Sequence, residues 1–563
     1  MARLGLSSWL HPKPATTTTT TSSADAEKLK TKRKSLAAFT STLKETSNPK
    51  ENGTGTKTNG HRPPTADMDL RTTPSNATEA PPPSRMMALA QTITEETKKL
   101  EAYLTAHDLP LPSFDVDAPA DYPKLPADIA KSRNAIIVAT KELGLLAHGP
   151  RESVRWAVWE FLDVLALQLI NHFGIAKLVP LTHPIPLSTL STLTRLDPIN
   201  LARALRLVMT KGLFREPSPN LIAHTAASRA LAEDADLEAW LGFNADDIFP
   251  AAAHVLEAIT AYPEATSLTR SGFCFAFDTV DKEPMFVTFG KDANRARRMG
   301  RAMASLTGGE GYEVRYLLDV EGGGYDFGEV DARGGTLVDV GGSVGFVAVE
   351  MARRYRNMKF VVQDLPKTVE SAPRPVDGDE QVAGRVRLMA HDFWGEQSVK
   401  GADVYFFRWI LHNYSTPYAL QILKNIIPAL KPGARIIIND HCLREAGAEN
   451  PWDEIVMRRM DVVMLALLNA QERTEEEYRE LFRAASENFV FLGVTRPKGC
   501  RMSIIEAVWQ PKEEEETPTT SGGITPSPVA ESDGEEMASA APLSGVDGEE
   551  VVTTATARIA GDN

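Results

Sequence analysis

The spacing of apolar residues along the chain changes once, near residue 310. Between residues 86 and 310, apolar residues recur at positions i, i+3 and i+4, which is the spacing of amphipathic helices. The pattern predicts helices over residues 85–106, 128–147, 153–173 and 198–211. We therefore expect a mainly helical domain in this part of the chain.

Residues 187–223 predict a short helix, a turn at Asp197, a second helix and then a ribbon-like stretch. This is the outline of a winged helix-turn-helix. DNA binding is disfavoured, because the second helix carries only Arg203, Arg206 and Lys211 and has no dense basic face to meet phosphates. A packing or dimerisation module is the better interpretation.

From about residue 336 the pattern changes to short apolar runs that alternate with helical segments. In chain order the runs are TLVDV, KFVVQ, VRLMA, DVYFFR, ARIIIND, FLGVT and SIIEAVW. Buried strands joined by helical crossovers form a doubly wound α/β sheet. Ligands bind at the carboxyl ends of the strands in such a sheet. The polar residues at those ends are therefore the candidate functional residues.

Composition separates two tails from the folded part of the 563-residue chain. Residues 15–83 and the segment after residue 511 are rich in Ser, Thr, Pro and charged residues, and bury too little apolar surface to offset chain entropy. We predict a disordered arm over residues 1–85 and an acidic disordered tail over residues 511–563.

The formal net charge is −14, and the part between the tails is acidic. Nucleic acid is not expected as a partner, because phosphate binding requires an excess of Lys and Arg.

The number of cysteines and the lengths of the apolar runs indicate the cellular compartment of the protein. Cys274, Cys442 and Cys500 are odd in number and far apart, so neither a disulfide framework nor a Cys-x-x-Cys metal site is predicted. No run of about 18 apolar residues occurs, so no membrane span is expected. These features favour a cytoplasmic protein. Residues 1–24 lack acidic groups and are rich in Ser and Thr, which leaves a transit peptide as an alternative.

The first strand of the sheet leads into a glycine-rich junction, GGSVG, over residues 341–345, and a helix follows directly. Gly341 and Gly345 let the backbone approach a ligand and aim helix N–H groups at it. A dinucleotide fingerprint would need glycine where Ser343 and Phe346 stand. The segment also matches G-x-S-x-G, the nucleophile elbow of hydrolases, but that elbow normally follows several strands, and this strand opens the sheet. A plain tight turn is the remaining alternative.

Acidic residues at the ends of the next two strands extend the candidate site. Asp364 stands 25 residues after Asp339, where it can accept hydrogen bonds from both hydroxyls of a ribose, although it can equally cap the following helix. After the third strand, Asp392 can accept a hydrogen bond from an adenine amino group and the ring of Phe393 can pack on the face of the adenine. Together with the glycine junction, these residues predict an adenosine site without a phosphate cradle.

The fourth strand continues as RWILHNY, over residues 408–414. With the glycine junction and FVVQDLP, this segment resembles the S-adenosylmethionine-dependent O-methyltransferases of plant phenolic and fungal polyketide metabolism, over roughly residues 150–510. The resemblance implies a winged-helix dimerisation domain over residues 86–310 and a Rossmann-like class I methyltransferase domain over residues 311–510. It further implies S-adenosyl-L-methionine as cofactor, a small phenolic substrate and a homodimer.

The resemblance also implies roles for individual residues. His412 stands at the position of the family's general base, and Asp440 in ARIIIND and Glu472 in QERT are the two acids that flank it. Arg408 is implied at the cofactor site, where plant members often have Lys. Asp440 stands where plant members often have Glu, which shortens its reach to the histidine.

A phenol has a pKa near 10 and an imidazole a pKa near 6.5, so proton transfer from a phenol to His412 is unfavourable unless the site compensates. A sulfonium charge beside the developing phenolate and a carboxylate on the far ring nitrogen would offset that difference. A catalytically silent protein with a regulatory or assembly role is the alternative.

A metal site formed by His391, His441 and His412 is disfavoured, because the spacing matches no metal motif. Methionines can line an apolar substrate pocket or simply fill the core; the candidates are Met299, Met303, Met460 and Met464, with Phe275.

Overall fold

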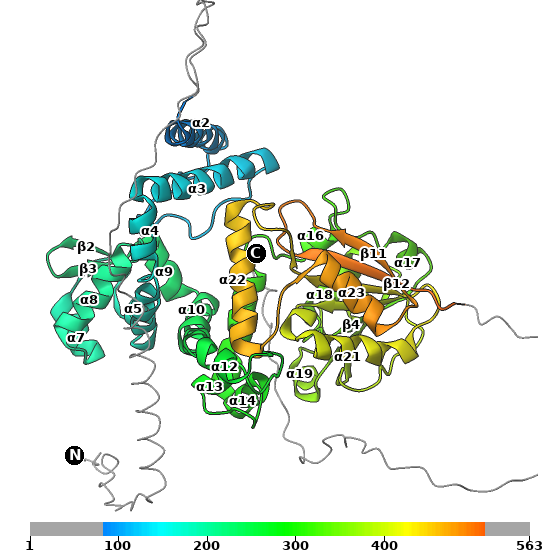
Figure 1. The fold of residues 1–563 in the computed structure, drawn as a ribbon. Coiled ribbons are helices and arrows are strands. Elements are labelled where there is room, and N and C mark those ends of the chain that lie inside the picture. Colours follow the sequence, from blue (N-terminus) through cyan, green and yellow to red (C-terminus); the bar gives the residue numbers. More distant parts are fainter. Residues whose placement is uncertain (1–82, 513–563) are drawn as a thin grey trace, which may run out of the picture. The chain divides into compact units, whose positions relative to one another are not determined.

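The computed structural model describes residues 83–512 (Figure 1). The predicted disordered arm over residues 1–85 and the predicted tail over residues 511–563 lie almost wholly outside the described residues. The described part begins with a mainly helical region and continues as a region built around a seven-stranded sheet. No helix in residues 83–512 is both long enough and apolar enough to cross a membrane.

Helices dominate the region before residue 310, as the apolar spacing predicts. Polar residues begin several of them: the Asp197 side chain accepts hydrogen bonds from the backbone N–H groups of Ile199 and Asn200, and Pro198 follows as the first helical residue. The helices are α2 Arg85–Ala106, α3 Ala127–His148, α4 Pro150–Ala157, α5 Phe161–His172, α6 Ile175–Leu178, α7 Leu187–Thr194, α8 Pro198–Met209, α9 Ala226–Glu233, α10 Ala235–Phe243, the π-helix η1 Asn244–Ile248, α11 Phe249–Ala253, α12 Val255–Ala261, α13 Gly272–Ala276, α14 Met285–Lys291 and α15 Ala293–Thr307.

The single helix predicted over residues 153–173 is two helices in the structure, α4 and α5. Between them, the backbone N–H groups of Trp159 and Glu160 donate to carbonyls three residues back, at 3.0 and 3.3 Å. This tighter turn interrupts the helical hydrogen-bond pattern while the apolar spacing continues through it. The spacing alone therefore predicted one element too few.

A small sheet is formed by strands before α7 and after α8. The strands β2 Arg215–Ser218 and β3 Leu221–Ala223 pair in antiparallel fashion, and β1 Ile185–Pro186 pairs with the other edge of β3. Leu201, Leu205 and Ile222 lie in the hydrophobic cluster that joins these strands to α5, α7 and α8.

The large sheet has the strand order β11-β12-β8-β7-β4-β5-β6. Its strands are β4 Thr336–Val340, β5 Lys359–Asp364, β6 Val386–Ala390, β7 Val404–Arg408, β8 Arg435–Asp440, β11 Phe489–Thr495 and β12 Ser503–Trp509. The five strands from β6 to β8 are parallel, as expected for a doubly wound sheet. β12 runs antiparallel to β8 and to β11, because β11 and β12 are joined by a short hairpin connection. The sheet is therefore mixed.

Helices and short elements connect these strands. The helices are α16 Arg315–Leu318, α17 Gly328–Ala332, α18 Phe346–Arg354, α19 Pro366–Ser371, α20 Glu380–Ala383, α21 Thr416–Ile426, α22 Pro451–Leu468 and α23 Glu475–Ala485. Two 3₁₀ turns, η2 Leu411–Asn413 and η3 Ile427–Ala429, and a two-stranded parallel pair, β9 Cys442–Leu443 and β10 Arg473–Thr474, complete the fold.

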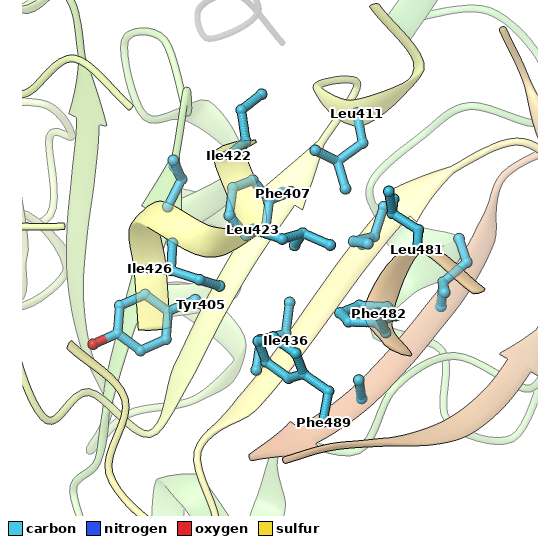
Figure 2. Close-up of a cluster of buried hydrophobic side chains, with 14 of the residues drawn as sticks. Tyr405, Phe407, Leu411, Ile422, Leu423, Ile426, Ile436, Leu481, Phe482 and Phe489 are labelled. Atoms are coloured by element: carbon cyan, nitrogen blue, oxygen red, sulfur yellow. The ribbon is translucent and has the colours of Figure 1, made fainter. Parts of the chain in front are cut away.

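Both faces of the large sheet are covered, which explains the unbroken apolar runs of its central strands. On one face, Tyr405 and Phe407 of β7 pack in a cluster with residues of α21 and α23, such as Phe482 (Figure 2). Val404 and Phe406, the alternate residues of the same strand, belong to the cluster on the other face, together with residues of α18. A strand buried on both faces holds its carboxyl-terminal residues at a fixed position on the sheet edge.

The helical region and the sheet region share a hydrophobic cluster. Met464 and Leu467 of α22 are buried in it with Phe273 of α13 and Phe289 of α14 (Figure 1 shows α22 beside these helices). α22 follows the parallel strands of the large sheet in sequence but packs on helices that precede residue 310. The segments that flank α22 are thereby placed between the two regions.

Candidate active site

The glycine junction forms a tight crossing at the carboxyl end of β4. The backbone N–H groups of Gly341 and Gly342 both donate to the carbonyl of Gln363 in β5, at 2.8 and 3.0 Å. Gly341 has φ 75°, and a Cβ built on it would lie 2.5 Å from Cδ1 of Ile410, the second residue after β7. Gly345 has φ 91° and is the residue before α18. The junction therefore favours glycine and brings Gly341, at the end of β4, close to the loop after β7.

Asp364 lies at the carboxyl end of β5, beside this junction. Its Oδ2 accepts the backbone N–H of Ser343 at 2.9 Å, and its Oδ1 accepts the backbone N–H of Leu365 at 2.8 Å. The side chain is buried. These contacts fix the carboxylate against the glycine junction, as the strand-end argument predicts.

Asp392 and Phe393 follow β6 on the same edge of the sheet. Asp392 is exposed, and its Oδ1 accepts the backbone N–H of Trp394 at 3.1 Å. The Phe393 ring packs edge-on against Trp394 and Tyr414, with centroids 5.4 and 5.8 Å away. Phe393 Cε1 lies 3.9 Å from the position of a Cβ on Gly341, so the structure brings this pair to the glycine junction.

Arg408 lies at the carboxyl end of β7 and is buried. Its guanidinium donates to Oδ1 of Asn439 and, at 2.5 Å, to the carbonyl of Tyr312, and burial lowers the pKa of Arg408 to about 10. Two of its nitrogens are thus used within the protein, while Nε has no hydrogen-bond partner among the described residues.

Sequence reasoning missed Asp339 as a site residue and used it only to count the distance to Asp364. Asp339 is buried in β4 beneath the glycine junction, where a Cβ on Gly342 would collide with its carboxylate. Burial raises the pKa of Asp339 to about 7, against the attraction of Arg408. Its Oδ2 has no hydrogen-bond partner in the described part of the chain. The available signal was an acidic residue inside the apolar run TLVDV.

His412 lies in η2, directly after β7, and is buried. Its Nδ1 is 2.9 Å from Oε1 of Glu472, and its backbone N–H donates to Oδ2 of Asp440 at 3.2 Å. The structure therefore brings all three predicted residues together. Asp440 holds the backbone of the histidine, in keeping with its shorter side chain, and Glu472 holds the ring.

The buried charges around the imidazole affect one another strongly. Burial alone lowers the pKa of His412, but attraction by Glu472 outweighs it, so the pKa is raised above that of a free histidine. Burial alone would raise the pKa of Glu472, but His412 and His441 lower it to about 2. Burial raises the pKa of Asp440. The cluster thus favours an ionised Glu472 and stabilises a proton on His412.

His441 was considered from sequence only as a metal ligand. In the structure it is fully buried, and its Nδ1 lies 3.3 Å from the same Oε1 of Glu472 that contacts His412. Residues 83–512 contain no group of three or more His, Cys, Asp or Glu side chains placed to hold a metal ion. The residue belongs to the carboxylate–imidazole cluster.

The predicted methionine pocket overlaps with the core. Met464 is buried in the cluster that joins the two regions, and three further methionines pack against that cluster, namely Met299, Met303 and Met460. Phe275 lies beside Tyr262, with ring centroids 6.2 Å apart. These methionines fill space between the helical region and α22.

Known proteins resemble the chain in sequence and in fold. Residues 327–487 match the O-methyltransferase domain family. The chain is 59% identical over 426 residues to the chlorophenol O-methyltransferase of Trichoderma longibrachiatum, covering 76% of this chain and 90% of that protein. It is 36% identical over 429 residues to the O-methyltransferase gsfB of Penicillium aethiopicum, covering 76% and 99%. The crystal structure of OxaC in complex with SAH and oxaline is similar in fold, with a TM-score of 0.60, 22% identity and coverage of 76% and 100%.

Proposed function

This chain belongs to the S-adenosyl-L-methionine-dependent O-methyltransferases, and we propose that it transfers the methyl group of its cofactor to a phenolic hydroxyl, with His412 as general base. The mixed seven-stranded sheet is that of class I methyltransferases. One observation carries the proposal. Glu472 holds Nδ1 of His412, while Nε2 has no hydrogen-bond partner within the described residues and is free to accept a proton.

The residues at the sheet edge fit the cofactor. Gly341 and Gly345 have φ angles of 75° and 91°, which favour glycine, and without side chains at these positions a ligand can approach the backbone. Asp364 would accept hydrogen bonds from the ribose hydroxyls, since each carboxylate oxygen can accept more than one. Asp392 and Phe393 would bind the adenine, and Arg408 would contribute positive charge near the junction. When bound, the cofactor supplies an electrophilic methyl group on a positively charged sulfur.

His412 would remove the phenolic proton as the methyl group is transferred. A free imidazole is a weak base for this purpose, because the pKa of a phenol is about 3.5 units higher. Glu472 raises the pKa of His412 and stabilises the imidazolium that forms. Asp440 fixes the backbone of the same residue, which keeps Nε2 in a constant direction.

We further propose a small phenol as the acceptor. The relative from Trichoderma longibrachiatum is named for chlorophenol, and it shares 59% of aligned residues with this chain. A halogen lowers the pKa of a phenol, which reduces the proton-transfer cost at His412. Chlorophenols and phenolic polyketides are therefore the first acceptors to test.

The helical region is proposed to be a winged-helix dimerisation domain over residues 86–310, followed by the methyltransferase domain over residues 311–510. The order of α7, α8, β2 and β3 supports the winged-helix interpretation. An apolar surface on α4, α5 and their connection supports dimerisation, since large exposed apolar patches mark interaction sites. Its exposed residues are Val154, Trp156, Val158, Trp159 and Phe161.

The cytoplasmic location stays a prediction, supported by three unpaired cysteines.

The hydrolase alternative at Ser343 has little support, because the chain belongs to a methyltransferase family and the Ser343 backbone N–H donates a hydrogen bond to Asp364. An unreacted Ser343 after treatment with a serine-directed phosphonate would exclude it.

Calorimetry with S-adenosyl-L-methionine, followed by mass spectrometry of chlorophenols and phenolic polyketides incubated with the protein, tests the proposed function. We expect cofactor binding and the gain of one methyl group by a phenol. Binding of the cofactor without methylation of any phenol would instead indicate a catalytically silent protein with a regulatory or assembly role.

A further inference from the structure

We infer that His441 is a positioning residue for the general base: it shares the Glu472 carboxylate with His412 and thereby sets the basicity of His412. The inference rests on the proposed function of His412 and deepens it. His441 would not touch the substrate, and its effect on the reaction would pass through Glu472.

The geometry fixes the protonation of both rings. Oε1 of Glu472 lies 2.9 Å from Nδ1 of His412 and 3.3 Å from Nδ1 of His441. An ionised carboxylate only accepts hydrogen bonds, so each imidazole must donate from Nδ1. Each Nε2 then carries a lone pair in the neutral ring. Because β7 and β8 are parallel neighbours, the residues that follow them bring both histidines to the same sheet edge.

The two lone pairs lie in different surroundings. Nε2 of His441 is buried without a partner among the described residues, and the ring is 0% exposed. Its neighbours are the rings of Trp409 and Tyr312, with centroids 5.0 and 5.8 Å away. Nε2 of His412 is not among the buried unpartnered atoms of residues 83–512. Only His412 is therefore placed to receive a proton from a substrate, and His441 is placed only to donate its Nδ1–H to Glu472.

Other charged and titratable groups surround this trio from every neighbouring element. They are Arg408 of β7, Asp440 of β8, Asp461 of α22, Arg473 of β10, Tyr478 of α23, Tyr312 and Arg501. Asp440 contacts the backbone of His412, and Asp461 accepts the backbone N–H of Glu472 at 2.9 Å. Within residues 83–512, Oε1 of Glu472 accepts hydrogen bonds from the two histidines and from no other group, and Oε2 is buried without a hydrogen-bond partner.

Loss of the His441 donor would therefore leave the negative charge of Glu472 to His412 alone. A less shared carboxylate attracts a proton on His412 more strongly. Less of the neutral base would then be present at a given pH, and the acidic limb of the pH profile would move to higher pH.

Two substitutions separate the donor from the ring. His441→Phe keeps a flat ring against Trp409 and Tyr312 and removes the N–H group. His441→Asn retains an amide N–H near the position of Nδ1. His441→Leu serves as a second variant without a donor should the phenylalanine variant fail to fold.

The test measures kcat/KM against pH with S-adenosyl-L-methionine and a chlorophenol, and titrates the ¹⁵N-labelled imidazole of His412 by NMR. In His441→Phe we expect both the acidic limb and the NMR titration of His412 to move upward by about one pH unit, a tenfold change in the protonation equilibrium. In His441→Asn we expect both near their wild-type positions. Unchanged titration of His412 in His441→Phe, or an equal shift in His441→Asn, would overturn the inference.

The NMR readout does not depend on catalysis, so the two proposals fail separately. A wild-type protein that methylates no phenol contradicts the proposed function, while the titration of His412 still decides the role of His441. If the wild type methylates a phenol and the pH at which His412 titrates is the same in His441→Phe as in the wild type, only the role of His441 is contradicted.

Discussion

The guanidinium of Arg473 donates a 2.8 Å hydrogen bond to the backbone carbonyl of Leu411, the residue before His412. A second hydrogen bond, of 2.6 Å, goes to the carbonyl of Tyr414. The arginine thus spans the 3₁₀ turn that carries the candidate base. Its side chain is only 1% exposed, so water cannot replace these hydrogen bonds if the guanidinium is lost.

Substitution Arg473→Met should therefore destabilise the protein and disturb His412 together. Two buried carbonyls would lose their donors, which we expect to lower the free energy of unfolding by about 2–4 kcal/mol in chemical denaturation. Arg479→Met removes an exposed arginine from the adjacent α23 and should change stability by less than about 0.5 kcal/mol. Equal stabilities of the two variants would contradict this role of Arg473.

Substitution of His412 tests the base directly. His412→Gln and His412→Ala should each lower kcat by about 10²–10⁴-fold, the usual contribution of a general base. Calorimetry should show nearly unchanged affinity for S-adenosyl-L-methionine, because His412 has no place among the proposed cofactor contacts. Turnover at the wild-type rate in either variant would remove His412 from the mechanism.

Crowding at Gly341 predicts loss of cofactor binding in Gly341→Ala. The new Cβ would lie 2.5 Å from Cδ1 of Ile410 and must push the side chain of Ile410 aside at the junction that the cofactor is proposed to approach. We expect the affinity for S-adenosyl-L-methionine to fall at least about tenfold, equivalent to 1.4 kcal/mol, in calorimetry.

Gly433→Ala is the matched control for this substitution. Gly433 has a similar φ of 80°, but a Cβ there meets no atom within 4 Å, so it reports backbone strain alone. Because Cδ1 is the clashing atom, adding Ile410→Val to Gly341→Ala should restore part of the affinity. Equal cofactor affinities in the Gly341 and Gly433 variants would mean that crowding has no effect on binding.

Substitutions in the exposed apolar surface on α4 and α5 should change the oligomeric state of the protein. Charges introduced by Trp156→Glu with Trp159→Glu should convert the proposed dimer to a monomer in sedimentation velocity at micromolar concentration, because an unpaired charge is costly to bury. Leu256→Glu places the same charge at an exposed apolar position of α12 and should leave the dimer intact. A double variant that sediments like the wild type would place the dimer interface elsewhere.

The central strands of the large sheet were predictable from sequence because both of their faces are buried. Runs such as ARIIIND are apolar through their middle positions, and a polar residue such as Asp364 then marks the strand end. The pairing of β12 between β8 and β11 was not predictable, since strand order depends on contacts between distant segments.

The candidate site was predictable where a residue follows a strand or carries a motif, as for His412 and Glu472. Two other features depend on three-dimensional neighbours. His441 shares a carboxylate with His412 only because β7 and β8 are adjacent, and Arg473 of β10 donates to Leu411, which lies 62 residues earlier in the chain. The break between α4 and α5 was missed because apolar spacing reports which face is buried and does not report the local hydrogen-bond pattern.

The low pKa of Glu472 predicts a specific loss of stability in acid. The folded-state pKa of about 2 lies below the ordinary value of 4.5, so the ionised carboxylate stabilises the fold above pH 4.5, and this contribution is lost as the pH falls toward 2. The difference in pKa corresponds to about 3 kcal/mol. The free energy of unfolding should therefore fall more steeply between pH 4.5 and about 2 in the wild type than in Glu472→Gln, which cannot titrate at this position. Glu487→Gln, at an exposed site, should follow the wild-type curve. Parallel curves for the wild type and Glu472→Gln would show that the two histidines do not hold this carboxylate ionised in the folded protein.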